Sequence, residues 1–95
     1  MPLFVISCVD RPGSLSLRLA TREAHLAYAA SPAPVRITLG GPFLDDAGDM
    51  CGTLMVVEAP DLAAAEAFAA GDPYRKADLF ERVEIRAWRQ AIPTA

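Results

Sequence analysis

Two segments of the chain are almost entirely apolar, and they restrict the possible folds more than any other feature. These segments are Leu3–Val9 and Gly52–Ala59. A short apolar run without alternating polar residues is typical of a strand that is buried on both faces. Val35–Leu39 and Arg82–Arg89 instead alternate apolar with polar residues, as strands with one exposed face do. The sequence therefore predicts a sheet whose first and third strands are central and whose second and fourth lie at the edges.

Two helical segments are expected between these strands. Ser14 is a suitable N-cap for a helix from about Leu15 to Ala30, and Asp61 for an alanine-rich helix over Leu62–Ala70. The resulting order is strand, helix, strand, strand, helix, strand, which is the split βαβ or ferredoxin-like pattern. We expect one α+β domain over residues 1–95, with a four-stranded antiparallel sheet in the order 4-1-3-2 and two helices on one face. No third layer is left for the other face, so we expect a homodimer in which a second copy covers it.

Glycine and proline mark the expected ends of these elements. Ser31–Pro34 is expected to end the first helix, and Gly71 the second. Gly40-Gly41-Pro42 is expected to break or bend the second strand. Asp72-Pro73-Tyr74 opens a short helical turn, with Asp72 as its cap and proline at its first position.

Composition argues against several classes of function. The chain has 9 Lys and Arg against 12 Asp and Glu, and its net charge of −3 disfavours binding to nucleic acid. Its apolar runs are far shorter than the ~20 residues that cross a bilayer, and no basic region precedes the N-terminal run as in a signal peptide. Cys8 and Cys51 are too few for a disulfide scaffold or a cysteine-based zinc site, and we interpret both as buried small apolar residues. We therefore expect a cytoplasmic protein with no cofactor, no metal and no membrane or nucleic-acid partner.

One side of the first predicted helix gathers polar side chains that could bind an anion. At about 100° per residue, four of them fall within roughly a quarter of the helix circumference. They are Ser14, Arg18, Arg22 and His25. Leucines border this strip on one side and Tyr28 on the other. Arginine and histidine at such spacing more often form a solvated helix face, but the apolar borders argue for a cleft.

His25 and Asp72 are the candidates for acid–base chemistry. His25 is the only histidine of the chain, and histidine as a residue type exchanges protons near neutral pH. A lone histidine is nevertheless more often structural than catalytic. Asp72 has a complete structural explanation as a helix cap, and the local signal favours that explanation.

The ordered set of short motifs in this chain resembles the YciI-like, or YCII-related, family. The motifs are Arg22-Glu23-Ala24-His25-Leu26, Gly41-Pro42-Phe43, Gly52-Thr53 and Asp72-Pro73-Tyr74. The resemblance covers nearly the whole chain and implies a ferredoxin-like dimer with a site centred on a histidine and an aspartate. One branch of that family is associated with dehydrochlorination of chlorinated hydroxyquinols. The short, proline-rich segment Ser31–Pro34 departs from the family pattern at the mouth of the expected cleft.

The resemblance also assigns roles to residues of this chain. The histidine is His25 and the aspartate is Asp72, with Asp10 at the end of the first strand as the alternative carboxylate. Side chains that line the same cleft and hold substrate are Arg18, Arg22, Ser14 and Asp10.

Two hypotheses of function follow. The first is a small dimeric enzyme without a cofactor, in which His25 acts as general acid and base and Asp72 orients it. Arg18 and Arg22 then hold a small anionic organic molecule that undergoes elimination, isomerisation or a lyase-type reaction. The alternative is a non-catalytic module for ligand binding or regulatory dimerisation, which uses the same arginines.

Overall fold

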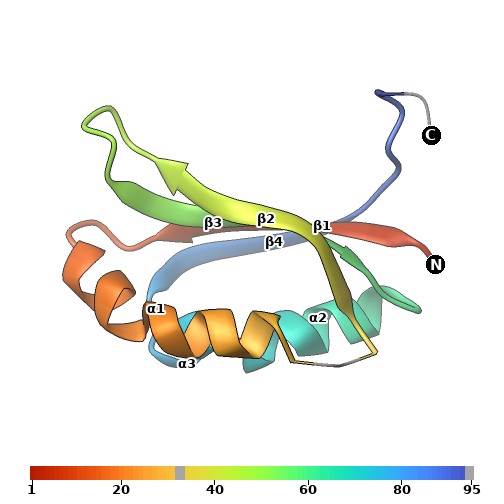
Figure 1. The fold of residues 1–95 in the computed structure, drawn as a ribbon, viewed down its shortest axis with the longest axis horizontal. Coiled ribbons are helices and arrows are strands. Elements are labelled where there is room, and N and C mark those ends of the chain that lie inside the picture. Colours follow the sequence, from red (N-terminus) through yellow and green to blue (C-terminus); the bar gives the residue numbers. More distant parts are fainter. Residues whose placement is uncertain (32–33, 94–95) are drawn as a thin grey trace.

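The two apolar segments form the central strands of one antiparallel sheet (Figure 1). The computed structural model describes residues 1–31 and 34–93. Its strands and helices are β1 (Leu3–Asp10), α1 (Leu15–Ala29), β2 (Arg36–Leu44), β3 (Met50–Glu58), α2 (Leu62–Gly71), α3 (Pro73–Lys76) and β4 (Phe80–Trp88). The strand order is β2-β3-β1-β4, so the predicted ferredoxin-like arrangement is confirmed. The Pro32-Ala33 half of the segment expected to end the first helix lies outside the described residues.

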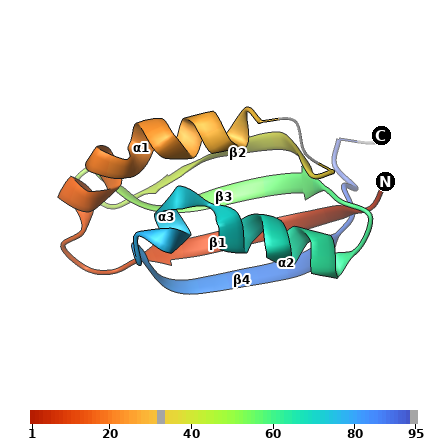
Figure 2. The same ribbon diagram turned by 90° about the horizontal axis from the view of Figure 1, so that it is seen from below.

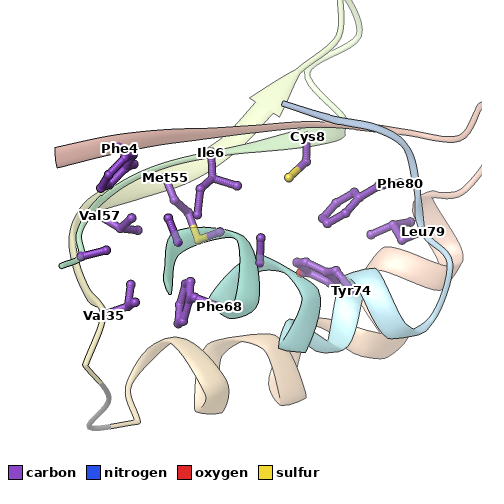
Figure 3. Packing of buried hydrophobic residues seen from close by; sticks show 13 residues of the cluster. Phe4, Ile6, Cys8, Val35, Met55, Val57, Phe68, Tyr74, Leu79 and Phe80 are labelled. Atoms are coloured by element: carbon purple, nitrogen blue, oxygen red, sulfur yellow. The ribbon is translucent and has the colours of Figure 1, made fainter. Parts of the chain in front are cut away.

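The register of the central strands decides which side chains face the helices. β1 pairs with β3 from Leu3 opposite Glu58 to Val9 opposite Gly52. Since side chains alternate between the two faces of a strand, Phe4, Ile6 and Cys8 of β1 point to the helices. There they join Met55 and Val57 of β3, Phe68 of α2 and Tyr74 of α3 in one buried cluster (Figure 3).

The second strand does not end at Gly40-Gly41-Pro42, where a break or a bend was predicted. β2 continues through this segment, with Gly41 opposite Leu54 and Pro42 opposite Thr53. Because β2 lies at the edge of the sheet, a proline without an N–H is tolerated there. The irregularities lie on either side, as register shifts between Ile37 and Leu39 and between Phe43 and Leu44. Such shifts bend a strand without ending it.

The helices all lie on one side of the sheet (Figure 2). Asp61 caps α2 as predicted, because its side chain accepts a hydrogen bond from the Ala64 N–H at 2.8 Å. Ser14 occupies the N-cap position of α1 but makes no side-chain capping hydrogen bond. The one buried side chain of α1 is a charged one, Arg18. Within the described ranges, no helix has the length and apolar character needed to cross a membrane.

Candidate functional site

A cavity of about 190 Å³ opens between α1 and the strands β2 and β3. Its polar lining consists of Arg18, Arg22, His25, Thr53 and Tyr74, and its apolar lining includes Leu26, Ile37, Met50 and Met55. An apolar cavity of about 150 Å³ is large enough to bind benzene. This cavity therefore has room for one six-membered ring with small substituents.

His25 is held in this cavity by Asp72. The imidazole Nδ1 lies 2.9 Å and 3.0 Å from the two carboxylate oxygens of Asp72, which is almost completely buried. Since a carboxylate only accepts hydrogen bonds, this contact places a proton on Nδ1. In the neutral ring the lone pair is then on Nε2, which has no hydrogen-bond partner among the described residues. The arrangement leaves His25 able to take up a proton from a bound molecule.

Asp72 combines the two roles that the sequence presented as alternatives. Its Oδ1 also accepts a hydrogen bond from the Tyr74 N–H at 2.9 Å, which caps α3. The cap fixes the carboxylate at the start of α3, and the fixed carboxylate in turn orients His25. The local sequence signal for a cap was therefore correct without excluding the contact with histidine.

The ring of Tyr74 contacts two side chains of α1. Its centroid is 4.2 Å from that of the His25 ring, at an interplanar angle of 19°, and the Arg18 guanidinium carbon lies 4.5 Å from it. Arg18 and His25 are about two helical turns apart, or roughly 10 Å along the axis. The ring therefore contacts side chains from two different turns of α1. Packing of Tyr74 thus sets the orientation of the two α1 side chains that line the cavity.

Arg18 is fixed from β1 and β3. Its Nε donates to Asp10 Oδ2 at 2.7 Å, and its Nη2 donates to Asp10 Oδ1 at 2.9 Å and to Thr53 Oγ1 at 2.7 Å. Burial lowers the pKa of Arg18, but the hydrogen bonds and the charge of Asp10 outweigh this effect and raise the pKa above its ordinary value. Arg18 is therefore a permanent cation with a rigid geometry.

Arg22 differs from Arg18 in its surroundings. It lines the same cavity but is exposed, and it has no ion pair or hydrogen bond with the described side chains. Its charge is consequently available at the entrance to an incoming anion, although salt screens such an exposed charge.

Not all of the expected site residues line the cavity. Arg18, Arg22 and His25 do. Asp72 does not, but it is hydrogen-bonded to His25 Nδ1. Ser14 lies outside it, beside the loop that connects β2 to β3. Asp10 also lies there, and its carboxylate is engaged by Arg18 rather than by His25.

Tyr28 was expected to border the polar strip, but it connects α1 to α2. Its hydroxyl donates to the Phe68 carbonyl oxygen at 2.7 Å, and its ring stacks on that of Phe68 with centroids 5.0 Å apart. Gly71 leaves room for it, because a Cβ there would lie 2.5 Å from the Tyr28 hydroxyl oxygen.

Thr53 and Tyr74 are the polar lining residues to which the sequence argument gave no role. Both belong to short motifs of the family resemblance, Gly52-Thr53 and Asp72-Pro73-Tyr74, and that was the one available signal. Their place in the site depends on the register of β3 and on the way α3 packs, which no local pattern reveals. The same holds for Met50 and Met55 on the cavity wall.

The two cysteines are both free. Cys8 is buried opposite Thr53, two residues from Cys51 along β3. Burial raises the pKa of Cys8 to about 12, and the charge of Asp72 acts in the same direction. A thiol in this state is a poor nucleophile, consistent with its interpretation as a small apolar residue.

In the described part of the chain, no three His, Cys, Asp or Glu side chains are grouped so that they could hold a metal ion.

The fold and the site together define a small ferredoxin-like domain with a hydrogen-bonded histidine–aspartate pair beside a cavity of about 190 Å³. The family model of the YCII-related domain matches residues 2–89. Protein YciI of Escherichia coli is 31% identical over 101 residues, covering 95% of this chain and 99% of its own. A protein of Haemophilus influenzae is 32% identical over 96 residues, covering 94% and 98%. The chain belongs to the YCII-related, or YciI-like, family.

Solved structures show the same fold. The 5-chloro-2-hydroxyhydroquinone dehydrochlorinase TftG of Burkholderia phenoliruptrix, in complex with 2,5-dihydroxybenzoquinone, is 36% identical, with a TM-score of 0.81. The similarity covers 94% of this chain and 95% of that enzyme. An antibiotic biosynthesis monooxygenase has a TM-score of 0.57 at 15% identity, over 96% of this chain and 99% of its own, and supports the fold alone.

Proposed function

We propose that this protein is an enzyme that transfers protons on a small, oxygenated, single-ring anion and so catalyses an elimination or an isomerisation. The observation that carries the proposal is the pair formed by His25 and Asp72, in which Nδ1 is bound and Nε2 is left unpaired. The cavity beside His25 has the volume of one substituted ring. A substrate of this size brings its reacting atoms within reach of the imidazole.

The proposed chemistry uses groups of this chain. His25 Nε2 takes a proton from the substrate, and Asp72 stabilises the imidazolium that forms. The same nitrogen returns the proton at another position or to a leaving group. Arg18 and Arg22 stabilise the negative charge that develops on a substrate oxygen.

The similarity to TftG supports this class of substrate. That relative is named a dehydrochlorinase of 5-chloro-2-hydroxyhydroquinone and was solved with 2,5-dihydroxybenzoquinone. Loss of HCl from a chlorinated hydroxyquinol requires a hydroxyl proton to be moved to the carbon that carries chlorine, after which chloride leaves and a second hydroxyl proton is released. Both proton transfers are within the capacity of an acid–base pair. The chlorinated hydroxyquinol is therefore the first compound to test, although other oxygenated rings fit the same cavity.

The test is chloride release from 5-chloro-2-hydroxyhydroquinone in anaerobic buffer, measured by ion chromatography. We expect turnover by the wild type and a loss of at least about a hundredfold in His25→Gln, the range for removal of a general acid–base group. Glu23→Gln is the matched control, since Glu23 is exposed on α1 and does not line the cavity. Circular dichroism checks that all three proteins are folded.

Three results are informative. Chloride release by His25→Gln at the wild-type rate would contradict the role of His25. Tight binding of the compound by the wild type without turnover would favour the non-catalytic binding module. A loss of activity in Glu23→Gln equal to that in His25→Gln would indicate a general defect of α1 rather than a missing proton acceptor.

We further propose that the protein is a homodimer through the sheet face that the helices leave open. Side chains alternate between the two faces along β1, so Val5 and Val9 point to this face whereas Cys8 points to the helices. Apolar side chains on it include Leu3, Val5, Val9, Phe43, Leu54 and Trp88. Arg82, Glu84 and Arg86 of β4 share the face and carry both signs of charge. A two-fold related copy could bury the apolar residues and match the charges.

A further inference from the structure

We infer that Gly40 sets the size of the ring substituent that the cavity accepts, and that the substrate carries one small apolar substituent, such as a methyl group or a chlorine atom. The inference rests on the proposed function and deepens it, because it describes a part of the substrate other than its ionised oxygen. Gly40 lines the cavity from β2, on the side that faces α1.

A register shift in β2 brings Gly40 to the cavity. Ile37 packs against the buried cluster on the helix side of the sheet. In a regular strand Leu39 would be the next residue on that side, because side chains alternate with a period of two. The register shift between Ile37 and Leu39 instead puts Gly40 opposite Met55, which belongs to the buried cluster. Leu39 is 58% exposed, and a glycine takes its place beside the cavity.

A side chain at position 40 would fill part of the cavity. An added Cβ would lie 3.2 Å from Met55 Cγ, 3.7 Å from Ile37 Cγ2 and 3.2 Å from the Leu54 carbonyl oxygen. Met55 and Ile37 both line the cavity, so the Cβ would stand between two lining side chains. It would extend the wall by about 1.5 Å, the length of one carbon–carbon bond. The glycine therefore leaves a recess in the wall, bordered by Met55 and Ile37, which we call the Gly40 recess.

The close approach to Met55 would narrow the cavity further. Non-bonded carbon atoms prefer separations of about 3.5–4.0 Å, so a Cβ at 3.2 Å from Cγ requires the Met55 side chain to move. Methionine is flexible enough to do so. Met55 is only 3% exposed and packs within the buried cluster (Figure 3), so the open space available to it is the cavity. Gly40→Ala thus narrows the cavity both directly and through Met55.

The Gly40 recess suits a small apolar group on the bound ring. A ring that carries only hydrogen at this point would leave the recess empty, and its lining would lose dispersion contacts. A methyl group or a chlorine atom fills it. A carboxylate would lose water against Met55 and Ile37, which carry no hydrogen-bond donor in their side chains.

The experiment compares two ligands on each protein by isothermal titration calorimetry. The ligands are 2,5-dihydroxybenzoquinone and its 3-methyl homologue, which differ by one methyl group. We expect the wild type to bind the homologue about threefold more tightly, the gain from burying one methyl group. In Gly40→Ala we expect the homologue to bind at least about tenfold more weakly than the parent compound, as in an overpacked site. A general loss of affinity would change both Kd values alike and leave their ratio unchanged.

Gly41→Ala is the matched control. It adds the same methyl group one residue further along β2, where pairing with Leu54 turns the Cβ to the opposite face of the sheet. The backbone of Gly41 borders the cavity, but no heavy atom lies within 4 Å of its added Cβ. We expect the ratio of the two Kd values to stay within about twofold of the wild-type ratio. Circular dichroism checks that both variants are folded.

A second measurement uses the wild type alone and does not depend on the folding of a variant. In the isotope-labelled protein saturated with the 3-methyl homologue, we expect a nuclear Overhauser effect between the ligand methyl group and the Hα atoms of Gly40. This signal places the substituent in the recess directly.

The possible results separate this inference from the proposed function. The role of Gly40 is overturned by an unchanged Kd ratio in Gly40→Ala, by an equal change in Gly41→Ala, or by the absence of the Overhauser effect at saturation. A wild type that binds the homologue more weakly than the parent overturns the predicted substituent. All of these results leave the role of His25 intact, since chloride release tests that role. Failure of the wild type to bind either ring at millimolar concentration overturns the inference together with the proposed ring-anion substrate class.

Discussion

At the scale of single residues, the site is built around a buried charge. Arg18 is the one buried residue of α1, although that helix has several leucines that remain exposed. A buried cation is tolerated only when its partners replace water, and Asp10 and Thr53 do so here. At this position the protein lacks the stabilisation that burial of an apolar side chain would contribute to folding. The structure thereby retains a fixed donor at the cavity wall.

Cys8 makes the stability of the protein depend on pH in the alkaline range. Its pKa is about 12 in the folded protein and 9.0 for the unperturbed thiol. Between these values the unfolded chain loses a proton that the folded chain retains, so the free energy of unfolding falls as pH rises. The slope for one group is about 1.4 kcal/mol per pH unit. The raised pKa values of Tyr28 and Tyr74 act in the same direction at higher pH.

Urea unfolding at pH 7, 9, 10 and 10.5 checks this prediction on the wild type and on Cys8→Ala. We expect Cys8→Ala to be the less stable protein at pH 7, because it lacks a buried sulfur atom, but to lose less stability above pH 9. Cys51→Ala is the matched control, since Cys51 is only half-buried. Parallel loss of stability in the wild type and Cys8→Ala would show that Cys8 is not the group responsible.

At the scale of elements, the sequence predicted the helices and strands but not their environments. The helical period alone put Arg18, Arg22 and His25 on one side of α1, and they do share one cavity. Whether a given arginine is buried or exposed depends on which strand residue lies opposite. Thr53 binds Arg18 only because of the pairing between β1 and β3, and sequence spacing carries no information on this. The break that was allowed for at Gly40–Pro42 does not occur, because a proline without an N–H is tolerated in an edge strand.

Gly52 in β3 allows the two central strands to approach each other. A Cβ at this position would overlap with the backbone carbonyl oxygen of Cys8 and lie 2.9 Å from a ring carbon of Phe43. Because backbone atoms of a central strand cannot move aside cheaply, we expect Gly52→Ala to lower the free energy of unfolding by about 1–3 kcal/mol. Gly41→Ala in β2 is the matched control, with no heavy atom within 4 Å of the added Cβ. Thermal unfolding compares the two variants, and equal melting temperatures would refute the argument.

At the scale of the whole molecule, the distribution of apolar residues predicted the strand order. Only the first and third strands are apolar on both faces, and the structure places them in the centre. The helices, however, cover just one face of the sheet (Figure 2). The apolar residues of the open face are therefore not explained by the packing of a single chain. Val9, Phe43 and Trp88 are 37%, 38% and 42% exposed there.

The proposed dimer makes a specific prediction for this face. Light scattering during gel filtration should give a mass of about twice the 10.1 kDa of one chain. Leu54→Glu places a charge in the apolar patch, where its cross-strand partners Ser7 and Gly41 carry no charge, and should yield monomers, because burying an unpaired carboxylate costs more than the contact gains. Leu62→Glu is the matched control, since Leu62 is an exposed apolar residue on α2, away from this face. A monomeric wild type, or dissociation by both variants alike, would contradict the proposal.

The same pair of variants tests whether the site depends on the dimer. The cavity is lined by residues of α1, α3, β2 and β3 and lies on the helix side of the sheet, away from the open face. Monomeric Leu54→Glu should therefore bind 2,5-dihydroxybenzoquinone within about twofold of the wild-type Kd. If binding is lost while circular dichroism still shows a folded protein, the second copy must hold the cavity in shape across the sheet. Dimerisation would then be a condition of ligand binding, and the open face would belong to the functional part of the molecule.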